Sequence, residues 1–132
     1  MTQVEQVRAF NRAVAERIGA LNGDFLGRHR PMAESRLLWE IGADGADLRE
    51  LRARLGLDSG YATRLLHSLQ RQGLVRVQVA ADDRRVRHVE LTPHGDEERG
   101  ELDRRSDAVA WGFLEPLTET GRFHITLLHP CL

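Results

Sequence analysis

The chain has a single cysteine and no lysine. Its 132 residues include one Cys, Cys131, and all 19 of its Lys-or-Arg residues are Arg. One cysteine cannot form an internal disulfide, which excludes the disulfide-rich class of small secreted domains and favours a reducing compartment. No apolar run approaches the roughly 20 residues that a membrane-spanning helix needs. The N-terminus also lacks the apolar core of a signal peptide, so we expect a cytoplasmic protein without a membrane partner.

The charges are nearly balanced in number but unevenly distributed. The net charge is −1, and 30% of the residues are charged. Residues 47–92 carry nine Arg and six acidic residues, whereas residues 93–132 carry four Arg and eight acidic residues. The basic excess therefore falls on the central segment. Arg presents a planar donor fork suited to phosphates and guanine edges, although a coding bias toward Arg is the simpler explanation for the absence of Lys.

The central segment 47–92 begins with a pattern of two helices. In DLRELRARLG, three leucines recur at helical spacing, Asp47 and Glu50 have the spacing of a capping box, and Gly56 ends the pattern. The second helix, SGYATRLLHSLQRQG, is capped by Asp58 or by Ser59. Its apolar residues share one face, and they are Ala62, Leu65, Leu66 and Leu69.

Two short strands follow the second helix. LVRVQV and RVRHVEL alternate apolar and polar residues, as strands with one exposed face do, and AADDRR forms a charged turn between them. The order of these elements predicts a helix-turn-helix followed by a two-stranded β-wing. This arrangement places its second helix in a DNA major groove.

The outer face of the second helix and the wing supply the candidate DNA contacts. Arg64 has the chemistry to contact a guanine edge, and Arg71 a phosphate. Asp83 can hold the guanidinium of Arg85 for insertion into the minor groove. The alternatives are a solvated polar face and a surface ion pair worth little. The candidates are Ser59, Gly60, Tyr61, Thr63, Arg64, His67, Ser68, Arg71, Asp83, Arg84, Arg85 and Arg87.

A long helix is predicted on each side of the winged core, which spans about 33–92 within a single domain, 1–132. The first, about 2–22, has a heptad seam that packs either on a second chain or on the protein's own core. The second, about 93–120, begins at Thr92 with a bend near Gly112 and Pro116. The seam comprises Val4, Val7, Asn11, Val14, Ile18 and Leu21, and the stripe of the second helix comprises Leu102, Ser106, Val109, Phe113 and Leu117.

Other chemistry finds little support in the sequence. The six His form no i, i+4 pair on a predicted helix, and no HExxH or CxxC motif occurs, so we expect no metal site. Cys131 has no charged neighbour to activate it as a peroxide sensor. We find no nucleophile–base pair and no phosphate loop, and therefore expect no enzymatic activity and no cofactor. Phe10, Phe25 and Trp39 either line a ligand pocket or belong to the core.

The motifs LRELRARLGLDSGYATRLLHSLQRQGLV and DDRRVRHVELTPHG resemble those of the MarR family of transcription regulators. The second motif carries the family's Asp-x-Arg and Leu-Thr-x-x-Gly patterns. The resemblance covers roughly residues 3–120. It implies a mainly α fold, a winged helix-turn-helix flanked by long dimerisation helices. It also implies a homodimeric repressor that binds pseudo-palindromic operators in double-stranded DNA and is released by a small aromatic effector.

The chain is also similar to the MarR-like half of proteins in which that half is fused to a GNAT-type acetyltransferase. An alternative function is therefore the regulatory or protein-interaction half of an acetyltransferase system whose catalytic domain is separate. The tail at 123–132 departs from the family pattern, because HITLLHPCL alternates where an amphipathic last helix is usual. We expect it to add less to a dimer interface than that helix would.

Overall fold

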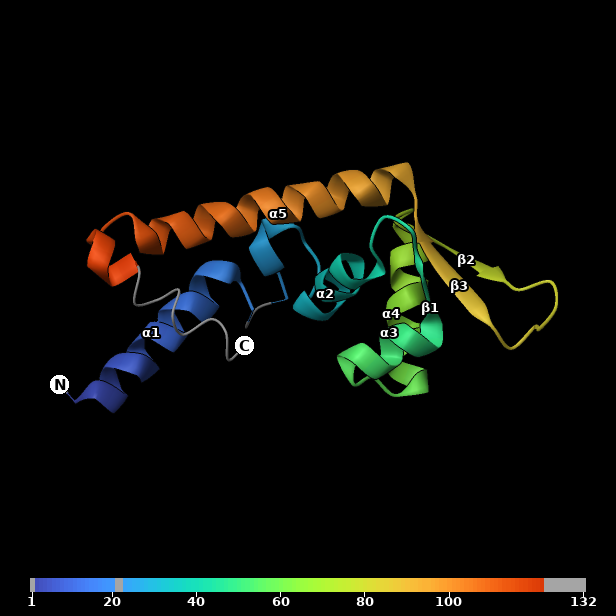
Figure 1. Cartoon of the computed structure of the whole chain (residues 1–132), viewed down its shortest axis with the longest axis horizontal. Coiled ribbons are helices and arrows are strands. Elements are labelled where there is room, and N and C mark those ends of the chain that lie inside the picture. Colours follow the sequence, from blue (N-terminus) through green and yellow to red (C-terminus); the bar gives the residue numbers. More distant parts are fainter. Residues whose placement is uncertain (1, 21–22, 123–132) are drawn as a thin grey trace.

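The computed structural model describes residues 2–20 and 23–122, and one long helix runs along one side of the molecule (Figure 1). This helix, α5 (Pro93–Leu114), lies along the top of the view, with α1 (Gln3–Ile18) beneath its C-terminal half. The 3-10 helix η1 (Phe25–Gly27) connects α1 to the group of helices beneath the N-terminal half of α5. That group is α2 (Met32–Ile41), α3 (Leu48–Leu55) and α4 (Ser59–Arg71).

Both long helices are shorter than predicted, for reasons of backbone chemistry. The Thr2 side chain accepts from the backbone N–H of Glu5, and the Glu5 side chain accepts from the backbone N–H of Thr2, so a capping box starts α1. Gly19 is left-handed, with φ of 71°, and it ends α1 four residues before the predicted boundary. Pro116 cannot continue a helix, and α5 ends at Leu114 rather than near residue 120. The predicted bend thus occurs at Pro116.

The predicted capping box of α3 is wrong. Asp47 is the N-cap residue, but its side chain makes no capping hydrogen bond. Its Oδ1 lies instead 3.4 Å from Nδ1 of His88, because Asp47 belongs to a short strand whose neighbour carries that histidine.

The wing sheet has three strands rather than two. β1 (Ala46–Asp47), β2 (Val75–Val79) and β3 (Arg87–Leu91) are antiparallel in the order β1-β3-β2. The sequence pattern does not predict β1, because two residues are too few to show alternation. By pairing with β3, β1 fixes the start of α3 beside the wing.

The core lies where α2, α3, α4, the sheet and the first half of α5 meet. Fully buried side chains come from each of them, including Leu38, Leu51, Leu69, Val89 and Leu102. In contrast, α1 contains no buried residue, although Ile18 packs against the core from its end. This architecture confirms the mainly α winged helix-turn-helix. None of the helices in the described part of the chain combines the length and apolarity that a membrane span requires.

Candidate nucleic-acid interface

The turn between α3 and α4 determines which face of α4 is exposed. Gly56 adopts φ of 65°, and the next backbone N–H, that of Leu57, donates to the Arg52 carbonyl at 3.0 Å. Asp58 rather than Ser59 caps α4, because its carboxylate accepts from the Tyr61 N–H at 2.8 Å. The four predicted inward residues of α4 are all buried. The opposite face is therefore left to the polar residues.

Most of the predicted contact residues of α4 are open to solvent. The exposed ones are Ser59, Gly60, Tyr61, Arg64, His67 and Arg71. The guanidinium of Arg64 lies over the Tyr61 ring, 5.7 Å from its centroid. This contact orders Arg64 on the outer face without using its hydrogen-bond donors.

Two predicted contact residues are instead engaged within the protein. Thr63 is half-buried, and its hydroxyl donates to the Ser59 carbonyl at 2.9 Å. Ser68 is also half-buried, and its Oγ accepts from the Gln72 side-chain amide at 3.2 Å. The residue types suggested both as contacts, because a sequence does not reveal the partners that a hydroxyl finds within the protein.

A groove separates α4 from the wing. Its volume is about 240 Å³, and it brings His67 of α4 together with Arg87 of β3. The sequence pattern did not reveal Gln70 of α4, or Val77 and Val79 of β2, as members of this groove. Only the folded wing places the two valines opposite α4. The full lining is Thr63, Leu66, His67, Gln70, Val77, Val79 and Arg87.

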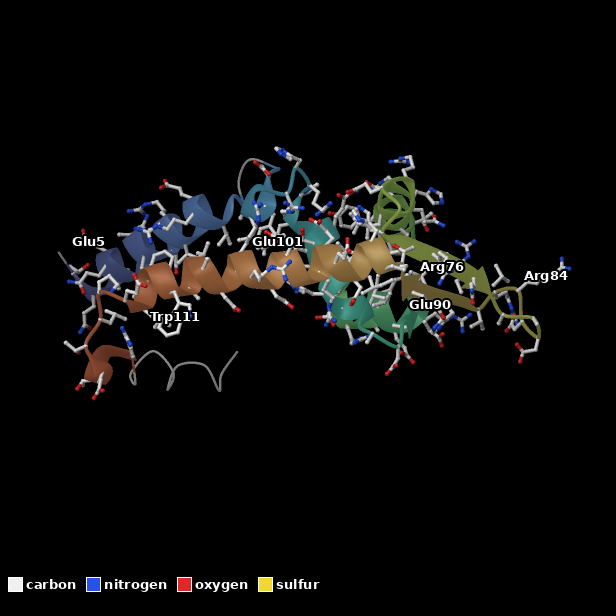
Figure 2. All side chains as sticks on the ribbon, turned by 90° about the horizontal axis from the view of Figure 1, so that it is seen from above. Glu5, Arg76, Arg84, Glu90, Glu101 and Trp111 are labelled. Atoms are coloured by element: carbon white, nitrogen blue, oxygen red, sulfur yellow. The ribbon has the colours of Figure 1, made fainter. Side chains whose placement is uncertain are left out.

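Asp83 organises the wing turn and also contacts Arg85. One carboxylate oxygen, Oδ1, accepts from the Arg85 backbone N–H at 3.0 Å and from Arg85 Nε at 3.2 Å. The backbone bond is the larger cause, and the side-chain bond the second, of a lowered pKa of the Asp83 carboxyl. The Arg85 side chain stays 83% exposed, and Arg84 stands near the tip of the wing (Figure 2). The arginines of this turn are therefore directed outward from an ordered backbone.

Arg49, in the first turn of α3, is a further exposed arginine that the sequence pattern does not place near the wing. Its charge contributes to lowering the pKa of Asp83, so it lies near the wing turn. Because β1 was not predicted, nothing in the sequence placed the start of α3 beside the wing.

The Leu-Thr-x-x-Gly motif joins the wing to α5. The Thr92 hydroxyl accepts from the Gly95 N–H at 3.0 Å and donates to the Gly73 carbonyl at 2.6 Å, just after α4. Gly95 lies against the backbone of Leu74 so closely that a Cβ there would be 1.9 Å from the Leu74 carbonyl oxygen. Thr92 and Gly95 of the motif therefore both serve to pack the start of α5 against the turn after α4.

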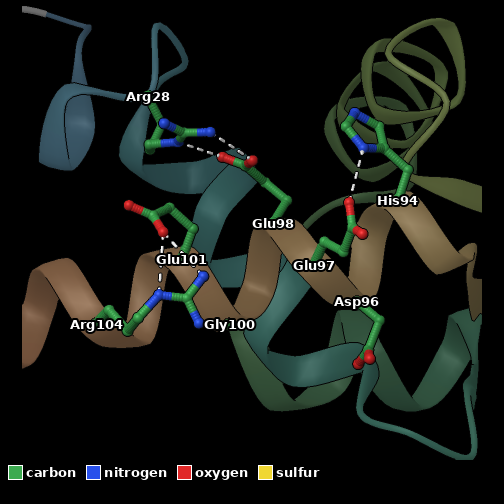
Figure 3. A pocket seen from close by; sticks show the side chains of 8 residues that line it. All are labelled: Arg28, His94, Asp96, Glu97, Glu98, Gly100, Glu101 and Arg104. Atoms are coloured by element: carbon green, nitrogen blue, oxygen red, sulfur yellow. Dashed lines mark hydrogen bonds and ion pairs between the residues drawn. The ribbon is translucent and has the colours of Figure 1, made fainter.

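A buried charge network beside the motif was not predicted. Glu98 of α5 accepts from Arg28 Nε at 2.6 Å and from Arg30 Nη1 at 2.5 Å, and the Arg28 pair is drawn in Figure 3. Arg30 also donates to the Gln72 side-chain oxygen at 3.0 Å. The bond from Arg28, reinforced by Arg30 against the opposing effect of burial, lowers the pKa of the Glu98 carboxyl to about 2. The sequence offers no periodicity that joins residues so far apart.

A cavity of about 710 Å³ lies beside this network. Figure 3 shows its lining of mostly paired charges, such as His94 with Glu97 and Arg104 with Glu101. In residues 2–20 and 23–122, no group of three or more His, Cys, Asp or Glu could hold a metal ion.

The three aromatic candidates for a ligand pocket do not come together. The rings of Phe25 and Trp39 pack edge to face at 5.7 Å, and Trp39 Nε1 donates to Asp103 at 2.8 Å. Phe10 instead packs edge to face on Phe113 of α5 at 5.3 Å. Phe25 is a core residue, and Phe10 belongs to the contact between α1 and α5.

A helix pair whose second helix has an exposed polar face beside a β-hairpin defines the class of winged helix-turn-helix domains. The model of the MarR family matches residues 30–86, from the loop before α2 to the wing turn. The sequence similarity to the MarR family therefore lies in the winged core of this chain. No curated protein is similar enough in sequence to match the chain.

Solved structures extend the likeness to nearly the whole chain. The PcaV transcriptional regulator from Streptomyces coelicolor has 22% identity and a TM-score of 0.75, over 97% of this chain and 92% of that one. A probable transcriptional regulator from Pseudomonas aeruginosa has 20% identity and a TM-score of 0.72, over 99% and 97%. S. aureus MepR in a DNA complex has 17% identity and a TM-score of 0.68, over 96% and 93%. At these identities the likeness establishes the fold.

Proposed function

We propose that the chain is a sequence-specific DNA-binding transcription regulator. The observation that carries this proposal is the division of α4 into a buried apolar face and an exposed face bearing Arg64, His67 and Arg71. An α-helix fits the major groove of B-DNA, where Arg reads guanine edges in bidentate fashion. The outward arginines of the wing flank that helix, in reach of phosphates and of the minor groove. The DNA complex of S. aureus MepR, which has the same fold, supports this reading.

We propose further that the regulator acts as a homodimer on a pseudo-palindromic operator. Large apolar side chains are exposed at the end of the molecule remote from α4: Val4 is 68%, Val7 58%, Phe10 49% and Trp111 54% exposed. A shallow cavity of about 270 Å³ lies against Val4 and Val7. Such side chains favour burial against a second copy. Two units are needed because one winged unit buries too little surface to select one site in a genome.

In this proposal the regulator is a repressor, and a small effector releases it from DNA in the cytoplasm. The structure of PcaV from Streptomyces coelicolor in complex with its natural ligand supports a ligand-responsive protein. We assign no catalytic step to the chain. Chemically, a repressor of this kind requires only binding surfaces for DNA, for its second copy and for the effector.

Selection from a random double-stranded DNA pool, followed by fluorescence anisotropy over a salt series, tests the proposal. We expect a two-fold symmetric consensus and a log-log salt slope set by the number of phosphates that the protein neutralises. Replacing Arg84 and Arg87 with Ala should make that slope shallower, by about 0.9 for each phosphate that a protomer no longer neutralises. Arg104→Ala is the matched control, since this exposed Arg pairs with Glu101 on α5 and should leave the slope unchanged. A pool with no enriched sequence would overturn the proposed function.

A further inference from the structure

The first turns of α5 hold the C-terminal end of α4. Thr92, Gly95 and Glu98 recur every three residues, so they lie on one side of the helix start. Thr92 bonds to the turn after α4 twice: its hydroxyl donates to Gly73, and its backbone N–H donates to the Leu74 carbonyl at 3.1 Å. We call Thr92, Gly95 and Glu98 the α4 clamp.

Gly95 acts in the clamp through the absence of a side chain. It sits in regular helix, so the backbone does not require glycine there. What requires it is space, because an added Cβ would lie 1.9 Å from the Leu74 carbonyl oxygen and 2.9 Å from its carbon. Backbone atoms cannot rotate away as the end of a side chain can. Any larger residue must therefore separate α5 from the end of α4.

Glu98 extends the clamp to the last turn of α4. Its carboxylate fixes Arg30, and Arg30 donates to Gln72, the C-cap residue of α4. The Gln72 amide in turn donates to the Ser68 carbonyl at 3.3 Å and to Glu34 at 3.4 Å. Both Glu98 and Arg30 are buried. The end of α4 is thus bound through its backbone by Thr92 and through its cap side chain by Glu98.

We propose that the α4 clamp sets the direction of the reading helix relative to α5, and thereby the half-site spacing that the dimer accepts. This inference rests on the proposed function. The clamp grips the end of α4 opposite to the N-terminal residues that enter the major groove in helix-turn-helix proteins. With 13 residues, α4 is about 20 Å long. A tilt of about 10° at the held end therefore moves the other end by about 3.5 Å, close to one base-pair step.

The test compares Gly95→Ala with Gly100→Ala, the same change further along α5, where the added carbon meets only the end of the Arg104 side chain, at 3.5 Å. Each variant is titrated against palindromes of the selected half-site whose spacers differ by one base pair. The unmodified chain and Gly100→Ala should prefer one spacer by about tenfold or more. Gly95→Ala should shift that preference by one base pair or reduce it below about threefold, while its base preference within a half-site is retained.

A distance measurement without DNA provides the second readout. Spin labels on Ser59→Cys, at the exposed N-terminal end of α4, in a Cys131→Ser background, report the separation of the moving ends of the two reading helices. Gly95→Ala should change or broaden this distance by about 3 Å or more, as one base-pair step requires, and Gly100→Ala should not. Thr92→Val keeps the side-chain shape and removes both hydroxyl bonds, so it should change the spacer preference and the label distance in the same way. If circular dichroism shows that Gly95→Ala is unfolded, Thr92→Val takes its place in both measurements.

The outcomes separate the inference from the proposed function. If the unmodified chain selects no DNA sequence or forms no dimer, the proposed function fails. If it selects a palindrome, and folded Gly95→Ala and Thr92→Val keep its spacer preference and label distance, the clamp does not set the spacing and the inference fails alone.

Discussion

Arg64 rests on the face of the Tyr61 ring in the free protein, with its guanidinium donors directed to solvent rather than to an acidic partner. A side chain that is ordered yet has its donors unused loses little entropy when it meets a guanine edge. Arg85 is held differently, because the Asp83 carboxylate accepts mainly from its backbone N–H and also from its guanidinium. The Tyr61 ring thus positions Arg64, and the wing turn positions Arg85.

Arg64→Ala should weaken binding to the selected operator by about 1–3 kcal/mol for each half-site while leaving affinity for random DNA almost unchanged. Arg71→Ala, at a predicted phosphate contact, provides the contrast and should weaken binding to both DNAs equally. Anisotropy titrations with operator and scrambled duplexes measure the difference. Equal losses for Arg64→Ala would show that this residue contacts only the DNA backbone.

At the wing, Arg85→Ala and Asp83→Ala should each weaken operator binding, and together they should weaken it by less than the sum. The reason is that Asp83 acts partly by holding the Arg85 backbone and guanidinium. A double-mutant cycle on operator affinity measures this coupling. Strict additivity would show that Asp83 does not position Arg85.

Among single residues, the four buried residues of α4 were predictable from helical spacing. Capping chemistry was a weaker guide, because it left Asp58 and Ser59 as alternatives for α4 and predicted a capping box for α3 that does not form. Glu98 was not predictable, because its partners lie about 70 positions earlier in the chain. The same holds for the contact between the Ser68 hydroxyl and the Gln72 side-chain amide.

At the scale of elements, the sequence predicted type and order better than ends. Both helices of the helix-turn-helix and both wing strands occur where the periodicity placed them, but a glycine and a proline shorten the two long helices. The strand β1 escaped prediction since its two residues are defined only by pairing with β3. The predicted role of the 123–132 tail lies outside the described residues.

The helix whose proposed role is most directly testable is α1. Val7→Glu should convert a dimer into monomers, because a carboxylate within an apolar interface has no compensating partner. Val7 is a better choice than Ile18, which also packs against the protomer's own core. Arg12→Gln changes the net charge by the same amount at an exposed polar position of α1 and should leave the dimer intact. Light scattering measures the mass, and a dimer of Val7→Glu would contradict the proposed interface.

For the whole molecule, the Glu98 network predicts how stability varies with pH. The pKa of Glu98 is lowered from 4.5 to about 2 in the folded state, so the unfolded chain binds this proton first as the pH falls. The stabilisation is therefore complete above about pH 4.5 and disappears as the pH approaches 2. Urea unfolding at a series of pH values measures it.

Glu98→Gln isolates this contribution from other carboxylates. At pH 7 the variant should be less stable by about 3 kcal/mol, because Arg28 and the buried Arg30 lose their counter-charge. The difference between the two proteins should shrink steadily below pH 4.5. A difference that stays constant from pH 7 to pH 3 would show that Glu98 is not held ionised by these arginines.

The exposed apolar side chains of α1 also make the folding of the protein depend on its concentration. Since no residue of α1 is buried in the protomer, a large part of its stability would come from association, and the law of mass action would then apply to folding itself. A tenfold dilution lowers the free energy of association by about 1.4 kcal/mol of dimer. Melting temperatures should rise with protein concentration, and at low copy number α1 should be the first helix to fray. Abundance would thus control both how many operators are occupied and how much of each molecule is folded.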